Sequence, residues 1–331
     1  MDYLIKLDCC IKQGQLPQKF GTILRKFYLS YSNALISNGL DILEFSLHFH
    51  KFLDLVLNQL AQPYHFESFH RKITDPFDYY RFGLDFIRPL IVYESSRILR
   101  AHMVDQMQAQ LAQGENVILL ANHQTEPDPQ IISLLLEKTH PQFAEEIIFI
   151  AGHRVITDPL AVPFSKGCNL LCIYSKKHVE TPPEQKAEKL QHNQRTMKRM
   201  GQLLSEGGKC IYVAPSGGRD RPNREGVVDV ARFDPQSVEM FWLMAQQAAQ
   251  KTHFYPLALA TYDLLPPPNS IQKELGERRH AQCAPVHLAF GSEIDMENFP
   301  GSQLTDKRQK RKLRADYIWE LVKQDYRLLK K

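Results

Sequence analysis

Short apolar runs that alternate with helical patterns constrain the fold of this chain more than any other feature. Six such runs, bounded by polar or turn-forming residues, predict strands at 116–121, 146–151, 170–174, 209–215, 254–261 and 286–291. Helical patterns lie between several of them, including 184–205 and 235–251. Strands that alternate with helices form a largely parallel sheet with helices on both faces. We therefore predict an α/β protein with a mixed, largely parallel sheet flanked by helices.

The N-terminal part of the chain carries helical patterns only. Helices are predicted at 2–12 and 18–37, and a third begins after Asp41 and ends at Pro63. Together they predict a small helical bundle that precedes the sheet. A boundary near 73–76 would divide the 331 residues into a helical bundle domain, 1–73, and an α/β domain, 74–331. The second domain is predicted to begin with a long helical stretch, 77–112, with Pro89 as a kink or break.

A histidine and an aspartate flank the predicted end of the first long strand. His123 follows the apolar run 117–121, and Asp128 comes five residues later, where Pro129 can begin a helix. A neutral imidazole can act as a base near pH 7 if a carboxylate holds its other ring nitrogen. The pair thus predicts a catalytic base and its partner. A helix cap beside a surface histidine remains the alternative.

Two more strands end in loops with basic residues. The loop 214–222 contains two glycines together with Arg219 and Arg221, and the loop 174–178 contains Lys177 and His178. Guanidinium forks and ammonium groups bind phosphate or carboxylate. Because loops after parallel strands meet at one edge of an α/β sheet, these residues predict a single anion site beside His123. The alternatives are an ordinary glycine loop and a solvated basic face.

Composition is typical of a globular protein from a reducing compartment. The six cysteines form no C-x-x-C pair, so we interpret them as reduced thiols, with zinc ligation as the alternative. No apolar run approaches the roughly 18 residues that a membrane-spanning helix needs. The net charge of +4, without a recognition motif, argues against nucleic-acid binding.

Several segments resemble one family in order and spacing. They are 122–128 (Asn-His-Gln-Thr-Glu-Pro-Asp), 149–155 with 157–159, 174–178 (Tyr-Ser-Lys-Lys-His), 214–222 (Ala-Pro-Ser-Gly-Gly-Arg-Asp-Arg-Pro) and 255–259. From about residue 75 onward, the chain resembles the soluble, plastid-type glycerol-3-phosphate acyltransferases of plants and similar bacterial enzymes. The resemblance implies catalytic roles for His123 and Asp128, no metal or cofactor, and binding of the substrate phosphate by Lys177, His178, Arg219 and Arg221. His153 departs from the family, which usually has an acidic residue there, so we give it no role.

The resemblance also implies a reaction and its partners. The reaction is transfer of a fatty acyl group from an acyl-carrier-protein or coenzyme A thioester to the sn-1 hydroxyl of glycerol 3-phosphate, the first step of phospholipid biosynthesis. We expect a bacterial cytoplasmic protein or a trimmed plastid-stromal form, with at most transient membrane association. The alternatives are a lysophosphatidate or other glycerolipid acyltransferase, an inactive acyl-carrier-binding homologue, and a hydrolase that uses Ser216 as nucleophile.

A basic run near the C-terminus has two interpretations. Residues 307–314 hold six basic side chains in eight positions and open a predicted helix. The simpler interpretation is a solvated helix face. Because acyl carrier proteins are strongly acidic, the alternative is a docking surface near the site that includes Lys310, Arg311 and Arg314.

Overall fold

The protein is described by a computed structural model that covers residues 2–174, 179–180, 182–268 and 275–331. Its main feature is an eight-stranded sheet in the order β1-β5-β4-β6-β3-β9-β10-β2. The strands β5, β4, β6, β3 and β9 run parallel to one another. At the two sides of this group, β1 is antiparallel to β5, and β10 is antiparallel to β9 but parallel to β2. The strand bounds are β1 (Phe69–His70), β2 (Arg97–Leu99), β3 (Asn116–Ala121), β4 (Ile148–Gly152), β5 (Asn169–Ile173), β6 (Cys210–Val213), β9 (Thr252–Ala260) and β10 (His287–Phe290).

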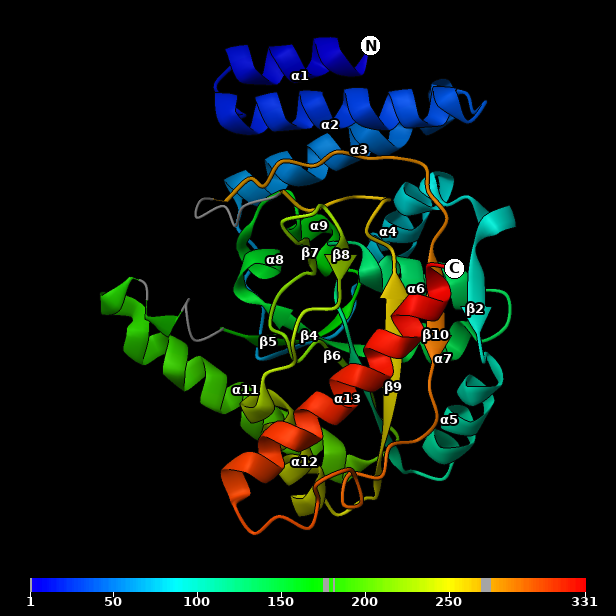
Figure 1. Cartoon of the computed structure of the whole chain (residues 1–331). Coiled ribbons are helices and arrows are strands. Elements are labelled where there is room, and N and C mark those ends of the chain that lie inside the picture. Colours follow the sequence, from blue (N-terminus) through cyan, green and yellow to red (C-terminus); the bar gives the residue numbers. More distant parts are fainter. Residues whose placement is uncertain (1, 175–178, 181, 269–274) are drawn as a thin grey trace.

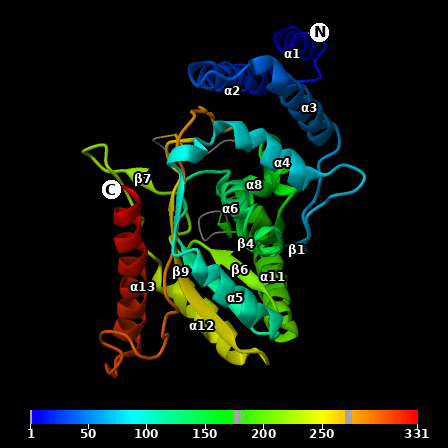
Figure 2. The ribbon, with the colours of Figure 1, turned by 90° about the vertical axis from the view of Figure 1, so that its right-hand side faces the viewer.

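Helices cover both faces of the sheet. Along β3, Val117, Leu119 and Ala121 face one side, where they pack with residues of α5 (His102–Ala112), α6 (Asp128–Leu136) and α7 (Pro141–Glu146). Ile118 and Leu120 face the other side, where α11 (Lys186–Glu206), α12 (Pro235–Gln247) and α13 (Lys307–Leu329) pack. Because successive side chains of a strand point to opposite faces, a strand buried on both sides is apolar throughout. Figure 2 shows α13 and α5 on different sides of β9.

The N-terminal helices lie beyond the edge of the sheet toward which β9 points (Figure 1). They are α1 (Tyr3–Lys12), α2 (Gln18–Ser37) and α3 (Ile42–Ala61). Their core residues pack with α4 (Tyr79–Ile87), with α9 (Val162–Ser165) through Phe164, and with apolar residues at 264–286. The division into domains 1–73 and 74–331 stays a prediction, although one apolar cluster includes residues from both sides of it.

The predicted fold class is confirmed, and all six predicted strands are present, with each end within two residues of the prediction. The helical stretch predicted at 77–112, with a kink or break at Pro89, is confirmed only in part. The helices α4 and α5 lie at its two ends and the break falls at Pro89, but the residues between the two helices are not α-helical. After α4 the chain continues through the 3₁₀ turns η1 (Arg88–Leu90) and η2 (Tyr93–Ser95) into strand β2, and only then into α5. Strand β2 forms because it pairs in parallel with β10, which lies far along the chain.

The remaining elements are short and border the loops of the sheet. They are α8 (His153–Thr157), η3 (Pro183–Gln185) and the hairpin of β7 (Arg221–Pro222) with β8 (Val228–Asp229). Four of the six cysteines are buried thiols, and all six are free. None of the helices in the described ranges is both long and apolar enough to cross a membrane.

Candidate active site

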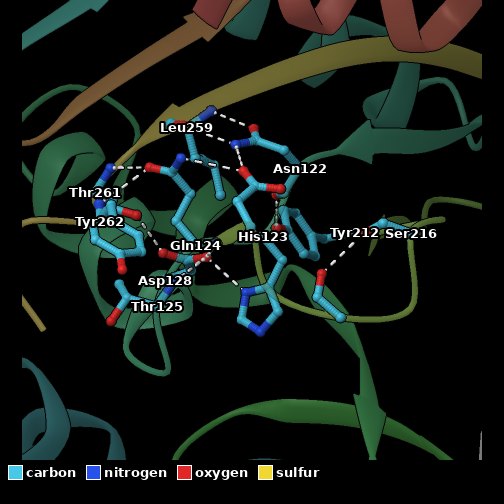
Figure 3. A network of polar contacts seen from close by, with 12 residues as sticks. Asn122, His123, Gln124, Thr125, Asp128, Tyr212, Ser216, Leu259, Thr261 and Tyr262 are labelled. Atoms are coloured by element: carbon cyan, nitrogen blue, oxygen red, sulfur yellow. Dashed lines mark hydrogen bonds and ion pairs between the residues drawn. The ribbon is translucent and has the colours of Figure 1, made fainter. Parts of the chain in front are cut away.

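His123 and Asp128 form a hydrogen-bonded pair just past the carboxyl end of β3. The imidazole Nδ1 lies 2.7 Å from Asp128 Oδ2. Because a carboxylate only accepts, Nδ1 is the protonated ring nitrogen and donates a hydrogen bond to Oδ2. The other ring nitrogen, Nε2, then has its lone pair available as a base. Figure 3 shows this nitrogen pointing away from the hydrogen-bonded network, and 29% of the His123 side chain is exposed. The pair therefore has the geometry of a general base that a carboxylate orients.

The Asp128 carboxylate is fully buried and fixed by further donors. Its Oδ2 atom accepts hydrogen bonds from the backbone N–H groups of Gln124 at 2.8 Å and Thr125 at 3.3 Å. Its Oδ1 atom accepts one from the Thr261 hydroxyl at 2.6 Å. Each oxygen thus has a defined partner, which fixes the orientation of the carboxylate that holds His123.

Asp220 connects the histidine loop to the arginine loop. Its backbone N–H donates to the His123 carbonyl at 2.6 Å. Its Oδ2 accepts from the side-chain amides of Asn122 at 2.7 Å and Gln124 at 3.2 Å, and its Oδ1 accepts from Ala231 N at 2.8 Å. Burial raises the pKa of Asp220 to about 6, while the donated hydrogen bonds oppose the rise. No separate role was predicted for Asp220, although it stands between the two arginines predicted to bind phosphate.

The residues on either side of His123 fix the loop to strand β9. Asn122 exchanges two hydrogen bonds with the backbone of Leu259, at 2.7 and 2.9 Å. The Gln124 carbonyl oxygen accepts from Thr261 N at 2.8 Å and Tyr262 N at 3.1 Å. These contacts, drawn in Figure 3, fix the backbone around His123 and Asp128. Their signal in the sequence is two amide side chains that flank a histidine.

Arg219 and Arg221 lie close together at the same edge of the sheet. Arg219 Nη2 contacts both Glu277 carboxylate oxygens, at 2.6 and 2.8 Å, and Arg154 Nη1 donates to the same carboxylate at 2.9 Å. Arg221 Nη1 donates to the Pro268 carbonyl. Burial, and then the positive charge of Arg219, lower the pKa of Arg221. Three guanidinium groups in one place form an attractive site for an anion.

The other predicted site residues have different outcomes. Lys177 and His178 lie outside the described residues, so their part in the anion site stays a prediction. His153 begins α8, and its ring centroid lies 4.9 Å from that of Tyr174. The Ser216 hydroxyl donates to the Gly218 carbonyl of its own loop at 2.9 Å, which gives no support to a nucleophilic serine. Within the described ranges, no group of three or more His, Cys, Asp and Glu residues is arranged to hold a metal ion.

The basic run 307–314 opens α13, and two of the three residues predicted to dock an acyl carrier protein are held by contacts within the protein. Arg314 is buried, donates to the Met296 carbonyl at 2.9 Å and forms an ion pair with Glu239. Arg311 pairs with the same carboxylate at 3.1 Å. Figure 1 shows that α13 begins at the edge of the sheet opposite to the one toward which β9 points.

A comparison with known families gives the class of protein that this fold and the His123–Asp128 pair belong to. A family model described as "Acyltransferase" matches residues 102–260, which include β3, His123, Asp128 and the loop of Arg219 and Arg221. A single stretch thus contains the predicted base, its carboxylate and two predicted phosphate-binding arginines.

Curated relatives narrow this class. The chain is 39% identical over 321 residues to a protein named "Glycerol-3-phosphate acyltransferase, chloroplastic" from Spinacia oleracea, an alignment that covers 96% of this chain and 68% of the relative. It is 40% identical to "Glycerol-3-phosphate acyltransferase ATS12, chloroplastic" from Cucurbita moschata, covering 98% and 72%. A third relative, from Arabidopsis thaliana, is 36% identical over 96% of this chain and 69% of its own length. The chain belongs to the glycerol-3-phosphate acyltransferase family.

Proposed function

We propose that this protein transfers a fatty acyl group from a thioester to the sn-1 hydroxyl of glycerol 3-phosphate and releases lysophosphatidate. The observation that carries the proposal is the hydrogen bond from Asp220 N to the His123 carbonyl, at 2.6 Å. It fixes the loop of the two arginines directly against the loop of the base. A base for a hydroxyl and a site for a phosphate are both needed for this acceptor. The names of the relatives agree with the same reaction.

The proposed chemistry is direct acyl transfer with His123 as general base. Nε2 takes the proton of the acceptor hydroxyl as its oxygen attacks the thioester carbonyl carbon. The tetrahedral intermediate collapses and the carbon–sulfur bond breaks. The departing thiolate then takes the proton from the imidazolium and leaves as a thiol. Asp128 stabilises the imidazolium while it exists. A thioester is already activated, so no covalent acyl-enzyme is required.

Arg219 and Arg221, together with Lys177 and His178, are proposed to bind the phosphate of the acceptor. A phosphate held at this edge would present the hydroxyl to His123 in a fixed orientation. Such orientation can contribute several kcal/mol toward the roughly 7–11 kcal/mol that ideal positioning supplies. The role of the arginines is then both affinity and alignment.

Both thioester donors, acyl carrier protein and coenzyme A, remain in the proposal. The reaction requires that donor and acceptor share one aqueous compartment. The relatives carry "chloroplastic" in their names, and for this chain we propose the plastid stroma or, in a bacterium, the cytoplasm.

The test is an assay of the purified protein with glycerol 3-phosphate and each thioester. Wild type should form lysophosphatidate, and His123→Ala should lose about two to four decades of kcat. His65→Ala replaces an exposed histidine outside the site and serves as the control that keeps wild-type rates. A folded His123→Ala protein with near-wild-type turnover would refute the assignment of the base.

A further inference from the structure

A carboxylate is buried among the arginines of the proposed phosphate site. Glu277 lies between Arg219 and Arg154, and only 5% of its side chain is exposed, against 14% for Arg219 and 20% for Arg154. Burying a carboxylate is favourable only if it is paired and hydrogen-bonded, and both arginines supply this. The pairing joins three segments that are distant in sequence, namely α8, the loop before β7, and the segment 275–284.

The position of Glu277 is fixed by the backbone on either side of it. Asp158, fully buried, accepts hydrogen bonds through Oδ2 from Gly276 N at 2.8 Å and from Glu277 N at 3.4 Å. Gly276 has a φ of +82°, a conformation that favours glycine. A Cβ atom there would also lie 3.0 Å from the Phe20 ring. These contacts fix the backbone at Gly276 and Glu277, and they place the Glu277 side chain against the arginines.

A second ion pair connects the same segment to the catalytic loop. Arg279 donates to both carboxylate oxygens of Glu126, at 2.8 and 2.9 Å, and its other terminal nitrogen donates to the Glu277 carbonyl at 3.0 Å. Glu126 lies between His123 and Asp128 in the chain. The segment of Glu277 is thus attached to the loop of His123 as well as to the two arginines.

The contact leaves part of the Arg219 guanidinium available. Glu277 contacts Nη2 of Arg219, and within the described ranges it is the partner of that side chain. Nε and Nη1 can therefore donate to an anion on the other side of the fork. The net charge of the group is +2, because it contains three guanidinium groups and one carboxylate, those of Arg154, Arg219, Arg221 and Glu277. A phosphate monoester carries nearly two negative charges at pH 7.

We propose that Glu277 is a positioning residue, which holds Arg219 and Arg154 so that the free side of Arg219 meets the phosphate of the acceptor. This inference rests on the proposed function of the site. The alternative is that the Glu277 carboxylate competes with the phosphate for the arginines. The two views predict opposite changes in affinity when the charge of Glu277 is removed.

Glu277→Gln tests the proposal, with glycerol 3-phosphate binding measured by calorimetry and turnover measured separately. We expect binding and KM for glycerol 3-phosphate to worsen about tenfold, the size of one charge-assisted hydrogen bond, while KM for the acyl donor stays unchanged. Glu277→Asp, which keeps the charge on a shorter side chain, should recover part of the loss. Unchanged or tighter binding by folded Glu277→Gln would overturn the proposal. If Glu277→Gln does not fold, Glu277→Asp alone decides, because weaker binding supports positioning and unchanged binding overturns it.

A matched control and a double-mutant cycle complete the experiment. Glu297→Gln removes an exposed carboxylate beside Met296, away from the site, and should leave binding unchanged. In an Arg219→Ala background, Glu277→Gln should add little further loss, since it acts through that arginine; fully additive losses would contradict this. Calorimetry also separates this inference from the proposed reaction. A wild-type protein that binds glycerol 3-phosphate without acylating it would refute the reaction, while the effect of Glu277→Gln on binding would still decide its role.

Discussion

Asp128→Asn separates two ways in which a carboxylate can assist a catalytic histidine. An amide in this position could rotate its NH₂ group toward His123 and select the wrong imidazole tautomer. The surroundings of Asp128 prevent this rotation. The N–H groups of Gln124 and Thr125 both point at the Oδ2 position, which must therefore hold the amide oxygen. The NH₂ group then occupies the Oδ1 position, where the Thr261 hydroxyl can accept from it.

The expected loss therefore comes from the missing charge. In the transition state His123 becomes an imidazolium, which the Asp128 carboxylate stabilises across a contact of 2.7 Å. With charge centres about 4 Å apart and an effective dielectric constant of about 20, the attraction is about 4 kcal/mol. This corresponds to about three decades of rate, and partial exposure of His123 reduces it. We expect kcat to fall by about 10²- to 10³-fold, with little change in KM for glycerol 3-phosphate.

The assay compares kcat and KM of Asp128→Asn with those of wild type, with circular dichroism and thermal unfolding as checks of the fold. Asp105→Asn is the matched control, because Asp105 forms a histidine pair outside the site, at 2.9 Å from His140 Nε2. The control should keep wild-type kcat. A loss in Asp128→Asn of less than about tenfold, with the fold intact, would refute the charge argument.

Three further predictions concern the rest of the site. Arg221→Lys should raise KM for glycerol 3-phosphate by about tenfold, because an ammonium group cannot replace a guanidinium fork; unchanged steady-state kinetics would remove Arg221 from the phosphate site. Ser216→Ala should retain kcat within about twofold by the same assay, since direct transfer uses no serine nucleophile. Burial raises the pKa of Asp220 from 3.8 to about 6, so its protonated form stabilises the folded protein below about pH 4, and this contribution is lost as the pH rises through about 6. Urea unfolding of wild type should show this component, on the order of 3 kcal/mol, and Asp220→Asn should lack it.

Local patterns predicted most of the sheet but failed where strands depend on distant partners. Strand β3 is apolar at nearly every position because helices cover both of its faces, so its sequence alone indicates a buried strand. Strand β2 has three residues and no strong pattern. It forms because β10 offers a free edge, which no local window of sequence contains. The same reason explains why the helical stretch predicted at 77–112 missed the strand that lies between α4 and α5.

The sequence by itself predicted the pairing of His123 with Asp128, because the two residues are five positions apart on one strand–loop–helix connection. It also indicated that Arg219 and Arg221 follow a neighbouring strand, since parallel strands place their loops at one edge. Only the tertiary structure decided what surrounds these groups. The hydroxyl of Thr261 on Asp128 and the carboxylate of Glu277 on Arg219 come from segments 133 and 58 positions away. Such contacts leave no periodic signal, because one hydrogen bond between distant segments requires only one suitable side chain at each end.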